Sequence, residues 1–106
     1  GAHGKGLVFF NGEPIGRSSL SQLTIGFQLG GQVYSEIIFF KDNVGLEDFN
    51  RGNFEMGAQV SAVALTAGAS ADTSYNGGVA VFTMAKGGLM YEASVGGQKF
   101  SYKPYK

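Results

Sequence analysis

Three lysines near the C-terminal end are the residues whose types and spacing best suit a binding function. Lys99 and Lys103 lie four residues apart in a predicted strand, so they share one face with Ser101, and Lys86 belongs to an earlier glycine-rich turn. Each cation near an anionic membrane surface contributes about 1 kcal/mol of attraction. The three lysines predict a small site for anionic phospholipid headgroups, although lysines that protect an edge strand from aggregation explain them equally well.

Catalytic and metal-binding chemistry has little support among the other polar residues. His3 is the only histidine and there is no cysteine, so thiolate nucleophiles and Cys/His metal sites are excluded, and we expect His3 to be an incidental exposed residue. Glu47 and Asp48 are adjacent, so on a helix they diverge by roughly 100°, and we expect them to complement the positive helix N-terminus. We therefore expect no enzyme, no metal site and no cofactor.

Two further glutamates and two glycine-rich segments could have functional roles, but we favour structural interpretations of them. Glu36 and Glu92 lie in predicted strand interiors among apolar neighbours; an inward carboxylate with a function is one reading, and a solvent-facing position is the one we expect. The glycine-rich residues 1–6 and 86–88 match neither the P-loop nor the dinucleotide-binding spacing, and residues 42–45 lack the spacing of a calcium loop.

The composition is that of one small domain rich in glycine and aromatic residues. The chain has 106 residues, including 18 glycines, nine phenylalanines and five tyrosines, and its formal net charge is zero. This length supports a single domain over residues 1–106. Zero net charge gives no long-range attraction for nucleic acid. Glycines inside strands mark bulges and bends, so the composition predicts a strongly curved sheet.

Strand patterns recur every eight to twelve residues along the chain. Predicted strands lie at residues 5–11, 14–17, 22–29, 32–41, 53–66, 79–85, 89–95 and 98–103. Asn11-Gly12 is a strong hairpin signal between the first two. In the last strand, Phe100 and Tyr102 are expected to face inward. This spacing is typical of an antiparallel all-β sheet or barrel.

Only one segment has the pattern of a helix, at about residues 43–51. Asp42 or Asn43 can cap its N-terminus, and Leu46 and Phe49 lie three residues apart on one face. About two turns are too short for an isolated helix, so packing must hold it. The fold class that we predict is therefore mainly β: a single domain with a curved antiparallel sheet or barrel-like meander and one short helix.

Several segments together resemble a known family. They are GAHGKGLVFFNGEPIG (residues 1–16), LTIGFQLGGQVYSEIIFF (23–40), LEDFNRGNFEMGAQVSAVALTAGASAD (46–72) and VAVFTMAKGGLMYEASVGG (79–97). The most specific part is a glycine signature, which consists of Gly26, Gly30, Gly31 and Gln32. Over nearly its whole length the chain resembles the SYLF domain, also called the Ysc84 actin-binding family. We expect the signature glycines to serve curvature and close packing of the sheet.

The resemblance implies a bacterial member of a family of lipid-binding modules. Eukaryotic members prefer phosphoinositides or other anionic phospholipids, fungal members bind actin, and the family is not enzymatic. Bacterial members are commonly exported, as periplasmic proteins or membrane-associated lipoproteins, although no signal peptide or membrane-spanning segment is visible in this sequence. Members also carry an N-terminal region with an amphipathic helix, which we expect this chain to lack.

Two functional hypotheses follow. The first is a non-enzymatic module that contacts anionic, phosphoinositide-like membrane surfaces through Lys86, Lys99 and Lys103. The second is a structural or protein-interaction module without lipid binding, in which exposed strand edges and aromatic residues pair with an actin-like partner or a second copy. The aromatic residues considered for that role are Phe10, Tyr34 and Tyr105.

Overall fold

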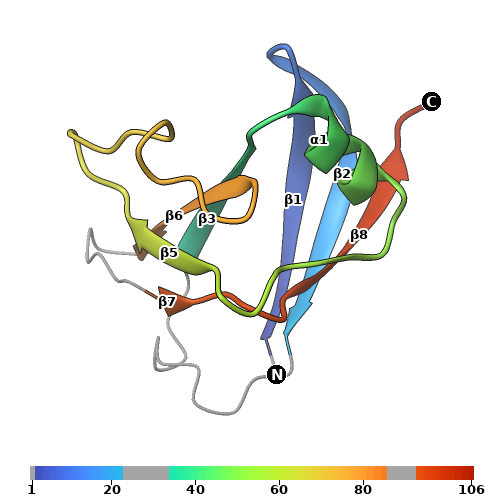
Figure 1. Ribbon diagram of the computed structural model, residues 1–106. Coiled ribbons are helices and arrows are strands. Elements are labelled where there is room, and N and C mark those ends of the chain that lie inside the picture. Colours follow the sequence, from blue (N-terminus) through green and yellow to red (C-terminus); the bar gives the residue numbers. More distant parts are fainter. Residues whose placement is uncertain (1, 23–33, 86–92) are drawn as a thin grey trace.

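Eight strands and one helix make up the described part of the chain. The structure is a computed structural model, and it describes residues 2–22, 34–85 and 93–106. Its elements are β1 (Ala2–Phe10), β2 (Glu13–Gln22), β3 (Tyr34–Phe40), α1 (Asn43–Asn50), β4 (Phe54–Glu55), β5 (Ser61–Ala64), β6 (Val79–Ala85), β7 (Ala93–Ser94) and β8 (Lys99–Pro104). The strands form two four-stranded sheets (Figure 1). Sheet A has the order β1-β2-β8-β4, and sheet B has the order β3-β6-β5-β7.

The hairpin of β1 and β2 follows from its turn residues. Asn11 and Gly12 have φ angles of 51° and 80°, both in the left-handed region that a tight hairpin turn requires. Asparagine and glycine adopt this conformation at low cost, so the predicted hairpin is confirmed. β2 is longer than the strand predicted at residues 14–17, because it continues through a run of serines that pair with both β1 and β8.

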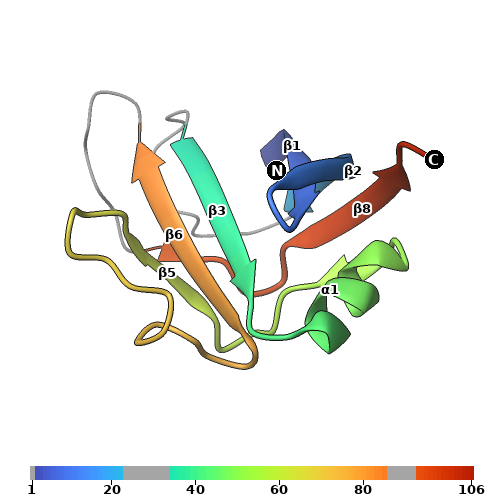
Figure 2. The same cartoon turned by 90° about the horizontal axis from the view of Figure 1, so that it is seen from above.

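The predicted class, mainly β with one short helix, is confirmed for the described residues. The two sheets are open and not joined into a closed barrel, and Figure 2 shows β1 and β3, one edge strand of each sheet, facing each other. Most pairings are antiparallel, but β5 pairs with β6 in parallel. The last three predicted strands, at residues 79–85, 89–95 and 98–103, were expected to pair in order as a meander. This is wrong, because β6 pairs with β3 and β5, whereas β8 pairs with β2 and β4.

The short helix α1 lies where the sequence predicts it. Asp42 is its N-cap, and its Oδ1 accepts a hydrogen bond from the Gly45 backbone N–H at 3.1 Å. The expected role of Glu47 and Asp48 at the helix N-terminus is wrong, since neither lies in the first turn. Asp48 instead forms an exposed ion pair with Arg51 at 3.2 Å, of the kind that contributes little to stability.

Phe49 holds this helix against both sheets. It is buried, and its ring lies 5.5 Å from Phe40 of β3, 5.4 Å from Phe54 of β4 and 5.4 Å from Phe100 of β8, measured between ring centroids. Tilted aromatic contacts of this kind stabilise a core beyond the area that they bury. One helical side chain therefore links the two strands that flank the helix in sequence, β3 and β4, to the distant β8.

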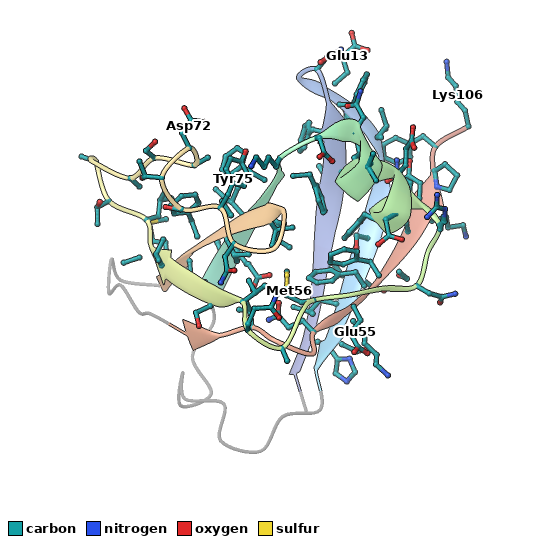
Figure 3. The ribbon with its side chains drawn as sticks, in the orientation of Figure 1. Glu13, Glu55, Met56, Asp72, Tyr75 and Lys106 are labelled. Atoms are coloured by element: carbon teal, nitrogen blue, oxygen red, sulfur yellow. The ribbon has the colours of Figure 1, made fainter. Side chains whose placement is uncertain are left out.

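The single strand predicted at residues 53–66 is wrong, because the structure divides it into β4 and β5. A turn separates them, in which the Val60 backbone N–H donates to the Gly57 carbonyl at 3.1 Å. Met56, just before this turn, points into the interior, while its neighbour Glu55 points away (Figure 3). The turn redirects the chain from sheet A to sheet B.

A close backbone approach fixes this turn against the segment before β8. An added Cβ on Gly96 would lie 2.6 Å from the Ala58 carbonyl oxygen and 2.8 Å from the Ala58 Cα. Both contacts are with backbone atoms, which cannot rotate away as a side chain can. Gly96 is therefore required for the two segments to lie this close together.

We expect Gly96→Ala to lower the free energy of unfolding by roughly 1–3 kcal/mol, because the added methyl group forces the two backbones apart. Urea denaturation followed by circular dichroism measures the change. Gly68→Ala is the matched control, since an added Cβ there meets nothing within 4 Å. Equal urea midpoints for the two variants would contradict the close approach.

Candidate functional site

The outer face of sheet A gathers most of its charged residues. On β8, Phe100 is buried and Tyr102 packs against the core, so the alternating residues Lys99, Ser101 and Lys103 point outward and are exposed. The antiparallel register places Arg17 opposite Lys103, Ser19 opposite Ser101 and Ser21 opposite Lys99. On β1, Lys5 lies opposite Ser19 and His3 opposite Ser21. We call the four cations of this surface the basic face; they are Lys5, Arg17, Lys99 and Lys103.

The cations of the basic face have little neutralisation by carboxylates among the described residues. Arg17 and Lys103 are cross-strand neighbours, and neither forms an ion pair within 4.0 Å in the part of the chain that the structure describes. Like charges directly opposite each other destabilise a sheet. Lys99 pairs with Glu55 of β4 at 3.7 Å, but both side chains are more than half exposed, so this pair is weak. An anion bound here would relieve the repulsion.

Exposed apolar side chains border the same cations. Leu7 lies opposite Arg17 in the β1 and β2 pairing, and it is 54% exposed. Phe9 is also 54% exposed, and both residues flank the buried Val8 on the opposite side of β1. Cations next to exposed apolar groups suit contact with a lipid bilayer, in which anionic headgroups lie above apolar chains.

The structure places only part of the sequence-predicted site. Lys99 and Lys103 share the outward face that their alternation predicts, whereas Lys86 lies outside the described residues. The glycine signature, composed of Gly26, Gly30, Gly31 and Gln32, also lies outside them, as does Glu92. Sequence reasoning missed Lys5 and Arg17. Ile15, two residues before Arg17, packs against the core, so simple alternation gives no signal that Arg17 faces outward.

The expectation that Glu36 faces solvent is wrong. On β3 it lies on the same face as Ile38 and Phe40, which pack against the core. Its Oε1 accepts a hydrogen bond from Nε2 of the fully buried Gln98 at 3.1 Å, which links sheet B to the segment before β8. Its Oε2 is buried and has no hydrogen-bond partner among the described residues. Burial raises the pKa of Glu36 to about 7, and the Gln98 hydrogen bond only partly opposes this shift.

A groove of about 990 Å³ opens between the two edge strands β1 and β3. Glu36 lines it, together with apolar residues of the core such as Val8, Leu20 and Ile38. The volume is typical of a small-molecule site, and such sites are mostly apolar with a few polar groups. The groove is therefore a second candidate site, and the edge-strand residues Lys5, Leu7 and Phe9 border both it and the basic face.

The described residues hold no cluster of three or more His, Asp or Glu side chains that could bind a metal ion. His3 is exposed on the outer face of sheet A. In the same part of the chain, no helix is long and apolar enough to cross a membrane.

Comparison with known proteins decides the family. A family model described as Ysc84, Las17-binding protein actin regulator, matches residues 21–104. The chain belongs to the Ysc84 family. This family consists of binding domains and is linked to lipid and actin binding, so membership supports a binding module in general.

A curated bacterial relative gives the same assignment. Over 72 residues the chain is 31% identical to Beta cell expansion factor A of Aeromonas veronii, and the match covers 68% of this chain. It covers 28% of that relative, so the matched region is about a quarter of the relative's length. No solved structure matches the chain.

Proposed function

We propose that the chain is a non-enzymatic lipid-binding module that contacts anionic phospholipid surfaces through the basic face. The observation that carries the proposal is the pair Arg17 and Lys103, which lie opposite each other without a carboxylate partner among the described residues. Membership of a family linked to lipid binding supports it. The exposed Leu7 and Phe9 beside these cations offer apolar contact with the upper part of a bilayer.

The strength expected of such contact is modest. Four cations at about 1 kcal/mol each near an anionic surface give roughly 4 kcal/mol, and salt screens this attraction within about 10 Å at 0.1 M. We therefore expect binding that depends on the fraction of anionic lipid and weakens as salt is added.

Removing two charges tests the basic face. We expect Arg17→Gln together with Lys103→Gln to weaken binding to vesicles with 30% phosphatidylserine about 30-fold, since two lost cations correspond to about 2 kcal/mol. Vesicle sedimentation at low salt measures the affinity. The matched control is Lys41→Gln with Arg51→Gln, which changes net charge equally at residues that are not part of the basic face.

Two results would refute the proposal. One is equal binding to anionic and neutral vesicles, and the other is an equal loss of binding in the control pair. A protein that binds neither kind of vesicle would instead favour the alternative, a structural or protein-interaction module. The exposed Phe10 and Tyr105 support that alternative, and so does the family description, which names Las17 binding and actin regulation. Sedimentation equilibrium and pull-down with actin would then test it.

A further inference from the structure

Two glycines of β1 leave the inner side of this strand bare. Gly4 and Gly6 alternate with Val8, whose side chain is buried in the core, so all three share the inward face. An added Cβ on Gly6 would meet nothing within 4 Å, and on Gly4 it would touch only Leu20 at 3.7 Å. Protein interiors are usually packed without large voids. The missing side chains account for part of the open volume between β1 and β3.

The walls of this groove are mostly apolar. Its lining residues include Val8, Leu20, Ile38, Phe40 and Phe100, which come from both sheets, and Leu46 and Phe49 from the helix. Exposed apolar residues of the two edge strands, Ile37 and Phe39 among them, continue the apolar surface outward. An open apolar groove of about 990 Å³ costs free energy in water, and a flexible hydrocarbon would gain by filling it.

The charged residues of the groove suit a ligand that carries a single negative charge. Lys5 and Lys41 line it, and Asp42 is the one carboxylate among its described lining residues besides Glu36. Burial disfavours the charged form of Glu36, so two lysines against Asp42 leave at most one positive charge. The Asp42 carboxylate is already engaged in capping α1. A single positive charge suits one carboxylate and not a doubly charged phosphate.

We propose that the groove between β1 and β3 binds one long-chain fatty acid, with its hydrocarbon chain along the bare inner side of β1 at Gly4 and Gly6. The carboxylate of the fatty acid then lies near Lys5 or Lys41. This inference goes beyond the proposed function, because it concerns a dissolved single-chain ligand held in the groove; Lys5, on the edge strand β1, is the one cation that the groove shares with the basic face. It does not depend on contact with a membrane.

Binding of cis-parinaric acid, a fluorescent C18 fatty acid, tests the groove without any vesicle. We expect saturable binding of one molecule per chain at submicellar concentration, and displacement by palmitate. Gly6→Phe fills the groove and should weaken this affinity at least tenfold. Strand positions favour aromatic and β-branched residues over glycine, so the variant should remain folded.

Two controls separate a blocked groove from other effects. Gly68→Phe makes the same change on an exposed loop glycine with open space around it, and should leave the affinity within twofold of the wild type. Gly4→Val offers a second block, since its Cβ would make only ordinary contact with Leu20. The Arg17→Gln and Lys103→Gln pair should still bind parinaric acid, which keeps this test independent of membrane binding.

Several results would overturn the proposal that the groove binds a fatty acid. Wild-type protein that binds no parinaric acid, or Gly4→Val and Gly6→Phe variants that bind it as the wild type does, would overturn the proposal. A large loss of stability in both variants would show that another part of this chain fills the groove. A wild-type dimer that Gly6→Phe dissociates would place a second copy there, and either result would also overturn it.

Discussion

Phe49→Ala is expected to lower the free energy of unfolding by about 3–5 kcal/mol, the usual cost of truncating a fully packed phenylalanine. Phe49 is 4% exposed, and its ring contacts Phe40, Phe54 and Phe100 at centroid distances near 5.5 Å. Because these partners belong to β3, β4 and β8, the cavity left by the truncation would lie at the junction of both sheets and α1. Small domains have only about 5–15 kcal/mol of total stability, so the variant should be close to unfolding at 37 °C.

Thermal and urea unfolding measure this loss directly. Val44→Ala is the control on the same helix, because Val44 is 71% exposed and its replacement should change stability by less than about 0.5 kcal/mol. A Phe49→Ala protein as stable as the Val44→Ala protein would mean that the aromatic cluster does not hold the helix. The position of α1 would then need another explanation.

Glu36→Gln is expected to remove a pH dependence of stability worth about 3 kcal/mol, which follows from a pKa raised from 4.5 to about 7. Burial is the main cause of the raised pKa, because it disfavours the charged carboxylate. The neutral glutamine keeps a side-chain oxygen that can accept the Gln98 hydrogen bond. It carries no charge into the interior at any pH.

The sign of the effect follows from which state binds more protons. Below pH 4.5 Glu36 is protonated in both states, and its contribution to stability is fully present. As the pH rises from 4.5 to 7, the unfolded chain releases the proton while the folded chain keeps it, so the free energy of unfolding falls. Above pH 7 the loss is complete. The wild type should therefore be less stable than Glu36→Gln at pH 8 and nearly equal to it at pH 4.

The difference in unfolding free energy between wild type and variant, measured by urea titration at several pH values, isolates this one group. Glu55→Gln is the control, since it makes the same chemical change at an exposed residue whose ion pair with Lys99 is weak. A difference between wild type and Glu36→Gln that stays constant from pH 4 to pH 8 would contradict the buried position of Glu36.

Features with local causes were predictable from the sequence. The Asn11-Gly12 turn and the Asp42 cap each depend on chemistry within four residues, and both predictions are confirmed. The outward position of Lys99 and Lys103 follows from simple alternation in one strand. Turn residues, helix caps and strand alternation depend on residues that are close in sequence, so they can be recognised without knowledge of the tertiary structure.

Features that need distant partners were not predictable. Arg17 joins the basic face only because β2 pairs with β8 in a register that puts it opposite Lys103. Serine-rich β2 has weak strand propensity of its own, and the ladder on both sides is what holds it in place. Glu36 lies in the interior beside Gln98, which is 62 residues away in sequence and belongs to the segment before β8. No local pattern carries that information.

The pairing of β2 with β8 also affects how the chain reaches its fold. Ser19 and Ser101 share a hydrogen bond at 2.6 Å although they are 82 residues apart in sequence. On a ribosome the hairpin of β1 and β2 emerges well before β8, and its inner side, with Val8 and Leu20, is not fully covered until β8 has been made. Sheets dominated by such distant pairings fold in milliseconds to seconds, and uncovered apolar strands are prone to aggregate meanwhile. Lys5 and Arg17 point outward from this unfinished hairpin, and their positive charges would oppose aggregation of nascent chains.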